Sequence, residues 1–256
     1  RPVVGAFTAT ATAQVRRDIL NLLGLENPTM VVTGFDRKNL YFGVRKPKDK
    51  FQELLSILRE EGSKSGIVYC ATRKLVEEVC QRLQDCGFSA ARYHAGLEDE
   101  ERQRSQEDFL YDRVTVMVAT NAFGMGIDKS NVSYVIHYNM PKDLESYYQE
   151  AGRAGRDGSP ARCILLYSGA DVRLNRFMIE QDKENEELDE ETARQVREKE
   201  LERLKQMTFY ATSRHCLRRF QLRYFGERQI PDTCGNCSVC LGERWDTQPE
   251  KSVYRP

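Results

Sequence analysis

The sequence predicts an α/β protein with a parallel sheet flanked by helices, followed by a small, mostly helical domain. Short apolar runs alternate with amphipathic segments between about residues 48 and 167. After residue 169 the composition shifts to interleaved acids and bases with few strand-forming residues, and four cysteines gather near the C-terminal end. Strands that alternate with helices indicate a parallel sheet that is covered on both faces.

The expected strands are short runs rich in apolar and β-branched residues. Such runs are typical of strands that are buried on both faces of a sheet. A run near the start of the chain, residues 3–7, is also expected to form a strand. In order along the chain, the others cover residues 66–70, 90–93, 114–118, 134–138 and 163–167.

Helices are expected where apolar residues recur on one face. The segment after Thr72 has this pattern, and threonine is a residue type that caps helix N-termini. Residues 98–110 open with four acids, which favour the N-terminal end of a helix. Another helix is expected at residues 13–23, stopped by Gly24, and an irregular stretch through residues 35–41 follows it.

The segment after residue 169 is expected to form a helical hairpin. Residues 180–191 carry eight acids and one lysine, which we interpret as a solvated helix face or a turn that would repel DNA. Residues 194–204 interleave Arg, Glu and Lys, a composition typical of an exposed helix. One face of this helix is expected to carry Leu201, Leu204, Thr208 and Ala211.

The bulk composition narrows the class of protein. A chain of 256 residues with 40% hydrophobic and 30% charged residues predicts one large or two modest domains. No run approaches the roughly 18 apolar residues that cross a bilayer, so no membrane partner is expected. A formal net charge of zero argues against indiscriminate coating of nucleic acid but allows a local basic face. We expect a reducing compartment, because a chain of this size does not need disulfides.

Four cysteines near the C-terminal end predict a metal site. Cys234, Cys237 and Cys240 follow one another at three-residue spacing, and Cys216 lies 18 residues upstream. Four thiolates around one ion are the usual arrangement of structural zinc, and such a closed site leaves no position for water. Disulfides, an iron–sulfur cluster, or His215 as a ligand in place of Cys216 are the alternatives.

A pair of arginines predicts a phosphate contact. Arg153 and Arg156 lie three residues apart in a frame of glycine and alanine, with Gln149 about one helical turn upstream. The guanidinium fork matches phosphate oxygens, and small residues let the segment approach a neighbouring surface closely. We interpret the pair as an arginine finger that reaches the γ-phosphate of a nucleotide across a domain gap. A surface helix with ion pairs is the alternative.

A glycine-containing turn at residues 120–128 follows a predicted strand directly. Gly124 and Gly126 would offer backbone N–H groups to phosphate, and Asp128 would accept a hydrogen bond from a ribose hydroxyl. Thr120, at the strand end, is a candidate contact to a DNA phosphate. An ordinary loop after a strand is the alternative.

Two further features bear on nucleotide chemistry. His94 ends a predicted strand and is a candidate phosphate contact, with a structural histidine as the alternative. The sequence contains no Gly-x-x-x-x-Gly-Lys-Ser/Thr and no acidic motif suited to Mg²⁺. We therefore expect that this chain cannot bind and hydrolyse ATP by itself.

Together these segments resemble the RecQ family of DNA helicases, within helicase superfamily two. Residues 149–158 closely match the family's motif VI. Residues 217–240, which include Tyr-Phe-Gly-Glu and Cys-Gly-Asn-Cys, are similar to the family's zinc module. Similarity extends along almost the whole chain. The other resembling segments are residues 7–12 for motif III, 67–73 for motif IV, 93–97 for the short motif after it, 119–129 for motif V, and 35–40 for the linker between lobes.

The resemblance implies a RecA-like lobe that supplies Arg156, and with it Arg153 and Gln149, to ATP and Mg²⁺ held mainly on another lobe. It implies movement 3′ to 5′ along single-stranded DNA, separation of duplexes, and roles in DNA repair and recombination. The zinc module would brace the helical hairpin against this lobe. The implied DNA contacts are Thr72, Arg73, His94, Thr120 and Asn121.

The same resemblance implies a division of the chain. Residues 1–36 would be the trailing end of a first RecA-like lobe and a linker, residues 37–170 the second RecA-like lobe, residues 171–246 the hairpin and zinc-binding domain, and residues 247–256 a tail. Lys38 stands where the family commonly has proline.

The P-loop, the acid box and the winged-helix domain of the family are not found in the sequence. We expect a piece of a longer enzyme that is inactive as an ATPase alone, monomeric, and located in the bacterial cytoplasm with the nucleoid or in the nucleus. A non-catalytic module that binds DNA or protein and carries structural zinc is the alternative. A structural zinc domain fused to a degenerate lobe is a third possibility, against which the intact arginine pair argues.

Overall fold

The protein is represented by a computed structural model that describes residues 3–8, 10–25, 27–124, 129–181 and 189–243. Within these residues the chain forms a six-stranded sheet with the order β1-β6-β5-β2-β4-β3, and all neighbouring strands are parallel. The predicted fold class is therefore confirmed. The strands are β1 (Leu40–Arg45), β2 (Gly66–Tyr69), β3 (Ala90–Tyr93), β4 (Val116–Ala119), β5 (Tyr134–His137) and β6 (Ala161–Leu166).

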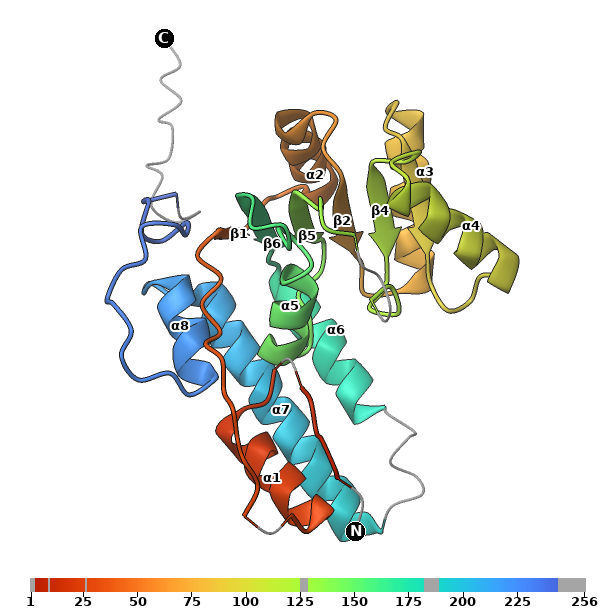
Figure 1. Ribbon diagram of the computed structural model, residues 1–256. Coiled ribbons are helices and arrows are strands. Elements are labelled where there is room, and N and C mark those ends of the chain that lie inside the picture. The colour runs from red at the N-terminus through yellow and green to blue at the C-terminus, as the bar shows by residue number, and fades with distance from the viewer. Residues whose placement is uncertain (1–2, 9, 26, 125–128, 182–188, 244–256) are drawn as a thin grey trace.

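Helices cover both faces of the sheet. Neighbouring residues of a strand point to opposite faces, and here both sets are apolar and buried under helices. Val68 and Ile136 pack on the face covered by α2 and α3, whereas Ile67 and Val135 pack with residues of α4, α5, α7 and α8. Figure 1 shows these layers and the hairpin of α6 and α7, which extends away from the sheet. The helices are α1 (Ala13–Leu23), α2 (Lys50–Glu61), α3 (Arg73–Asp85), α4 (Asp99–Leu110), α5 (Leu144–Ala151), α6 (Gly169–Glu180), α7 (Glu190–Thr212) and α8 (Leu217–Tyr224).

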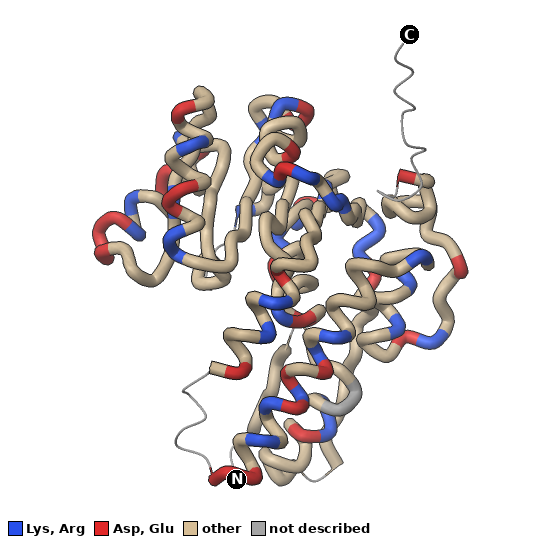
Figure 2. The backbone as a smooth tube through the Cα atoms, turned by 180° about the vertical axis from the view of Figure 1, so that it is seen from behind, with Lys and Arg blue, Asp and Glu red and all other residues tan. Residues whose placement is uncertain are grey.

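The α6–α7 hairpin has one covered face and one charged face. Of the four residues predicted to share one face, Leu204 and Ala211 are buried and Leu201 and Thr208 are half-buried. Met207 and Tyr210 are also buried. Figure 2 shows acidic and basic residues interleaved along the long helix α7, so neither charge dominates it. None of the helices in the described parts of the chain is both long enough and apolar enough to cross a bilayer.

Most predicted elements are confirmed, and one is wrong. Helix α1 covers residues 13–23 as expected, and it ends at Gly24 in the left-handed conformation. Residues 3–7 do not form the predicted strand: Val3 and Phe7 are fully exposed, so their apolar pattern pairs with no sheet. The acidic run is helical at both described ends, in α6 and α7, and residues 182–188 lie outside the described residues.

The edge strand β1 is covered by the cysteine-rich segment. Phe42 and Cys237 form a parallel bridge, and the Ser238 amide donates to the Phe42 carbonyl at 2.9 Å. The Val44 amide donates to the Ser238 hydroxyl at 3.2 Å. Backbone groups at the edge of a sheet need partners, and here the cysteine segment supplies them. The cysteine cluster and the sheet are therefore joined by main-chain contacts.

Gly66, at the start of β2, has no room for a side chain. A Cβ atom built there would lie 2.0 Å from the ring of Tyr134, which is 1% exposed. We predict that Gly66→Ala lowers the free energy of unfolding by about 1–3 kcal/mol, because the buried ring cannot move away without strain. The matched control is Gly169→Ala, where nothing lies within 4 Å, and a change near zero is expected. Equal urea midpoints for the two variants would contradict the packing described here.

Candidate functional site

Helix α5 leads directly into the segment that carries the arginine pair. Asp143 caps the helix by accepting a hydrogen bond from the Ser146 amide at 2.6 Å. Leu144 and Tyr147 are fully buried, so the helix is fixed against the core. The segment that follows, residues 152–159, carries both arginines and is called the arginine loop below. Because the arginine loop follows a helix that is packed firmly against the core, the side chains of the loop are expected to have defined directions.

The two arginines occupy different environments. The Arg153 guanidinium donates to the Gly124 carbonyl at 2.6 Å, whereas Arg156 is exposed. A Cβ atom built on Gly124 would lie 2.2 Å from Nη2 of Arg153, so the arginine occupies the space that a side chain would need. Arg153 therefore contacts another loop, and Arg156 is the more exposed of the two.

The glycine turn is anchored on both sides of its described part. The Thr120 amide donates to the Tyr93 carbonyl at 3.1 Å, and Phe123 is fully buried. The Tyr69 hydroxyl donates to the Phe123 carbonyl at 2.8 Å. Burial raises the pKa of Tyr69, while the nearby charges of Arg153 and Arg156 oppose that rise. Both guanidinium groups thus act on the environment of this turn.

The predicted nucleotide contacts Gly126 and Asp128 lie outside the described residues. Lys129 is buried and forms an ion pair with Asp112 at 2.6 Å. Hydrogen bonding from Lys129 holds the pKa of Asp112 below its usual range. The turn therefore has a firm anchor on its C-terminal side as well.

Gln149 links α5 to the start of the chain. Its side-chain amide donates to the hydroxyl of Thr10, and Thr10 is buried. Thr10, one of the threonines that sequence analysis singled out, thus contacts the helix that precedes the arginine loop. Gln149 is placed within reach of the arginine loop but already uses its amide in this contact.

The five predicted DNA contacts gather at one edge of the sheet. In parallel sheets, this edge, at the carboxyl ends of the strands, is where ligands bind. Thr72 and Arg73 follow β2, His94 follows β3, and Thr120 and Asn121 follow β4, which lies between those two strands. Among them Thr72, Arg73 and Asn121 are exposed, and Thr120 is buried.

His94 differs from the other four because its ring is covered. Its Nε2 lies 3.0 Å from a carboxylate oxygen of Glu77, and its Nδ1 accepts from the Gly96 amide at 3.2 Å. Since Nδ1 accepts, a neutral ring carries its proton on Nε2 and donates it to Glu77. Both ring nitrogens therefore have partners within the protein. The exposed side chain of Arg73 packs against Gly96, two residues after His94.

The four predicted cysteine ligands converge on one point. The sulfur atoms of Cys216, Cys234, Cys237 and Cys240 all lie within 4.8 Å of one another. Four sulfurs at about 2.3 Å from a tetrahedral zinc ion lie roughly 3.8 Å apart, so the cluster is close to that geometry. The Cys234 and Cys240 sulfurs are 4.0 Å apart, about twice a disulfide bond length, and all eight cysteines are free. His215 is exposed and lies outside the cluster.

Backbone amides point at the cysteine sulfurs. The Asn236 amide donates to the sulfur of Cys234 at 3.3 Å, and the Arg219 amide donates to that of Cys216 at 3.5 Å. Hydrogen bonding within the cluster lowers the pKa of Cys234 and raises that of Cys237 to about 12. Such amide contacts orient thiolate ligands, and a bound cation would release the remaining thiol protons. The chemistry of the donor set fits a structural zinc ion.

Two families match adjoining parts of the chain. Residues 49–158 match the helicase conserved C-terminal domain, and residues 169–241, which include the four cysteines, match the RecQ zinc-binding family. A solved structure, S. cerevisiae Dbp5 bound to RNA and ADP BeF3, has a TM-score of 0.58 and 22% sequence identity. It covers 76% of this chain and 54% of that one, and it supports the fold alone.

Several helicases align along nearly all of the chain. The ATP-dependent DNA helicase RecQ of Bacillus subtilis is 46% identical over 244 residues, which is 95% of this chain and 40% of that protein. The RecQ of Haemophilus influenzae is 42% identical, covering 92% of this chain and 36% of that protein. The ATP-dependent helicase SGS1 of Saccharomyces cerevisiae is 39% identical, covering 98% and 18%. The chain thus spans less than half the length of these relatives, and it belongs to the RecQ helicase family.

Proposed function

We propose that this chain is the C-terminal motor half of an ATP-dependent DNA helicase that moves 3′ to 5′ and separates duplexes. The observation that carries the proposal is the division between the two arginines. Arg156 is exposed in the arginine loop that follows a firmly held helix, while Arg153 donates to the Gly124 carbonyl. Arg156 is then the principal arginine finger, and Arg153 positions the loop that carries it.

In this proposal the chemistry depends on closure of a cleft between two lobes. A first lobe would hold ATP and Mg²⁺, and closure would bring the Arg156 guanidinium against the γ-phosphate. A preplaced cation stabilises the charge that develops on the transferring phosphoryl group without having to reorganise. Such a finger contributes roughly 10³- to 10⁵-fold to turnover. Gln149, beside it on α5, would contact the nucleotide side of the same cleft.

DNA would bind at the carboxyl edge of the sheet. Arg73 and Asn121 are the exposed candidates there, with Thr72 and Thr120 beside them. Arg153 contacts the turn that begins at Thr120 through the Gly124 carbonyl. A movement of DNA at this edge of the sheet would therefore be transmitted to the arginine loop through this one hydrogen bond. The glycine turn would therefore couple DNA contact to nucleotide contact, with Gly124 as the point where the two meet.

The cysteine cluster would hold a structural zinc ion. Its four sulfurs leave no open position, so the ion would stabilise the fold rather than take part in hydrolysis. We place the second lobe at residues 37–170 and the hairpin with the zinc-binding domain at residues 171–246. The chain alone, which has no P-loop sequence, would bind DNA without hydrolysing ATP and would be a monomer.

The arginine assignment is tested in a protein that joins this chain to the ATP-binding lobe. We predict that Arg156→Ala lowers DNA-stimulated kcat by about 10³-fold or more and leaves ATP affinity near normal, because the finger acts in the transition state. The control is Arg59→Ala, an exposed arginine in the last turn of α2. Turnover by the Arg156 variant equal to that of the control would show that the finger lies elsewhere.

The metal assignment is tested by elemental analysis together with thermal unfolding. We predict that Cys237→Ser removes zinc and lowers the melting temperature, because Cys237 is fully buried and bridges β1. Cys86→Ser, at an exposed and distant cysteine, is expected to retain one zinc per chain. The assignment is wrong if the Cys237 variant keeps a full equivalent of zinc, or if the folded natural protein contains none.

A further inference from the structure

We propose that Arg37 and Asn39 are positioning residues for the arginine loop, and that the zinc module holds both of them in place. The zinc module here means residues 216–243, which comprise α8 and the cysteine cluster. The inference rests on the proposed function, because it gives these two side chains a part in the turnover that Arg156 would serve. Neither residue touches the nucleotide in this account, since each acts through the backbone of the loop.

Arg37 holds the backbone on both sides of Arg153. Its guanidinium donates to the carbonyls of Gly152 at 3.3 Å, Ala154 at 3.0 Å and Gly155 at 2.8 Å. The last carbonyls of a helix have no partners within it, and a cation there is favoured by the helix dipole. One rigid fork thus satisfies three acceptors just after α5, which fixes where the loop leaves the helix.

Asn39 closes the arginine loop from its other end. Its side-chain amide donates to the carbonyls of Gly155 and Ser159, both at 2.9 Å. Arg156 lies between these two points. Gly155 has a φ of +56°, and a Cβ atom there would lie 2.5 Å from the Asn39 amide nitrogen. The loop therefore requires glycine at this position both for its backbone conformation and for the approach of Asn39.

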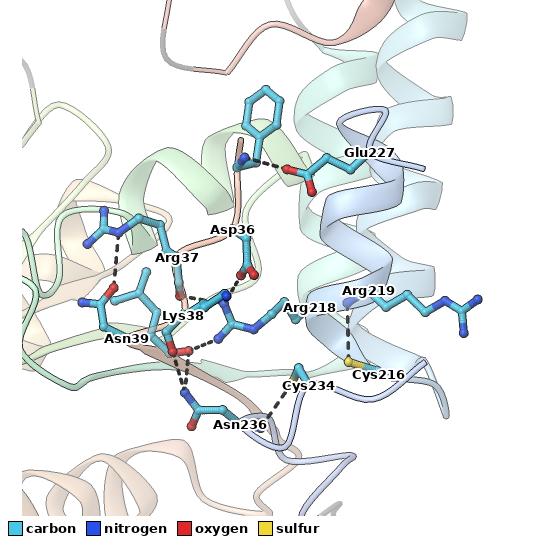
Figure 3. Close-up of polar contacts among 12 residues, drawn as sticks. Asp36, Arg37, Lys38, Asn39, Cys216, Arg218, Arg219, Glu227, Cys234 and Asn236 are labelled. Atoms are coloured by element: carbon cyan, nitrogen blue, oxygen red, sulfur yellow. Dashed lines mark hydrogen bonds and ion pairs between the residues drawn. The ribbon is translucent and has the colours of Figure 1, made fainter. Parts of the chain in front are cut away.

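The zinc module holds the segment that carries these two residues. Arg218 is 5% exposed, and its guanidinium donates to the Asp36 carboxylate at 2.8 Å, to the Arg37 carbonyl at 2.6 Å and to the Leu40 carbonyl. The Asn236 side chain donates to the carbonyls of Lys38 at 3.2 Å and Leu40 at 3.1 Å. Figure 3 shows both side chains converging on residues 36–40.

Both of these side chains depend on the cysteine cluster for their positions. Arg218 lies two residues after Cys216, and Asn236 lies between Cys234 and Cys237, with its own amide on the Cys234 sulfur. A third contact comes from Glu227, whose carboxylate accepts from the Phe35 amide at 2.6 Å. Hydrogen bonds, joined by the covalent backbone of residues 36–40, thus connect the cysteine ligands to the arginine loop. Metal binding would set the direction of the finger along this route.

The test uses single-turnover ATP hydrolysis by a protein that joins this chain to the ATP-binding lobe. We predict that Arg37→Ala and Asn39→Ala each lower the rate of hydrolysis roughly 10- to 100-fold, since small misplacement of a catalytic group has effects of this size. KM for ATP, zinc content and melting temperature are expected to stay near their original values. The control is Arg45→Ala, which removes an arginine of β1 that pairs with Glu53, away from the loop.

A double-variant comparison separates positioning from a general structural effect. If Arg37 acts through the finger, Arg37→Ala causes no further loss when Arg156 is already alanine. The inference fails if Arg37→Ala and Asn39→Ala hydrolyse ATP within twofold of the original protein, or if the Arg37 change lowers the rate by the same factor in both backgrounds. Normal hydrolysis by Arg156→Ala alone would instead refute the finger assignment, and this inference with it.

Discussion

The backbone of residues 36–40 is held from two sides, and the rest of the candidate site depends on this constraint. From one side, Arg218 and Asn236 occupy its carbonyl groups. On the other, its own side chains Arg37 and Asn39 hold the carbonyls of the arginine loop. Buried guanidinium groups are costly unless every donor is used, so such a contact fixes one arrangement rather than several. The cysteine cluster, the start of the edge strand β1 and the arginine loop are therefore parts of one hydrogen-bonded unit.

A second close contact, between Arg153 and Gly124, divides the work of the arginine pair. Any side chain at residue 124 would collide with the guanidinium, so the glycine makes the contact possible rather than merely allowing a turn. The Gly124 carbonyl accepts a hydrogen bond from Arg153, whereas Arg156 is exposed. The same turn starts at the sheet edge where the DNA candidates gather. In the proposed function, contact with DNA and contact with nucleotide would therefore be adjacent along a short stretch of chain.

Local patterns were enough to predict most helices and strands and the metal cluster. The cysteine spacing predicted the cluster because metal geometry restricts short segments, although only the structure decides for Cys216 over His215. Strand β1 was missed because its partners, β6 and the segment at Cys237, are distant in sequence. The same holds for Arg37, whose first carbonyl partner is 115 residues away. The strand expected at residues 3–7 was wrong because an apolar pattern does not supply a pairing partner.

Hydrogen exchange with and without metal tests the central constraint most directly. Withdrawal of the metal with a chelator should speed exchange at the amides of Leu40 and Ala161, which donate to the carbonyls of Arg37 and Asn39, and at the amide of Gly155, which lies in the arginine loop itself. Amides in the central strands β2 and β4 should keep their protection, because Val68, Val116 and Val118 pack with α2 and α3 on a face that includes none of the four cluster cysteines. If the amides of residues 36–40 and 152–161 stay as protected as in the metal-bound protein, the zinc module does not hold the arginine loop.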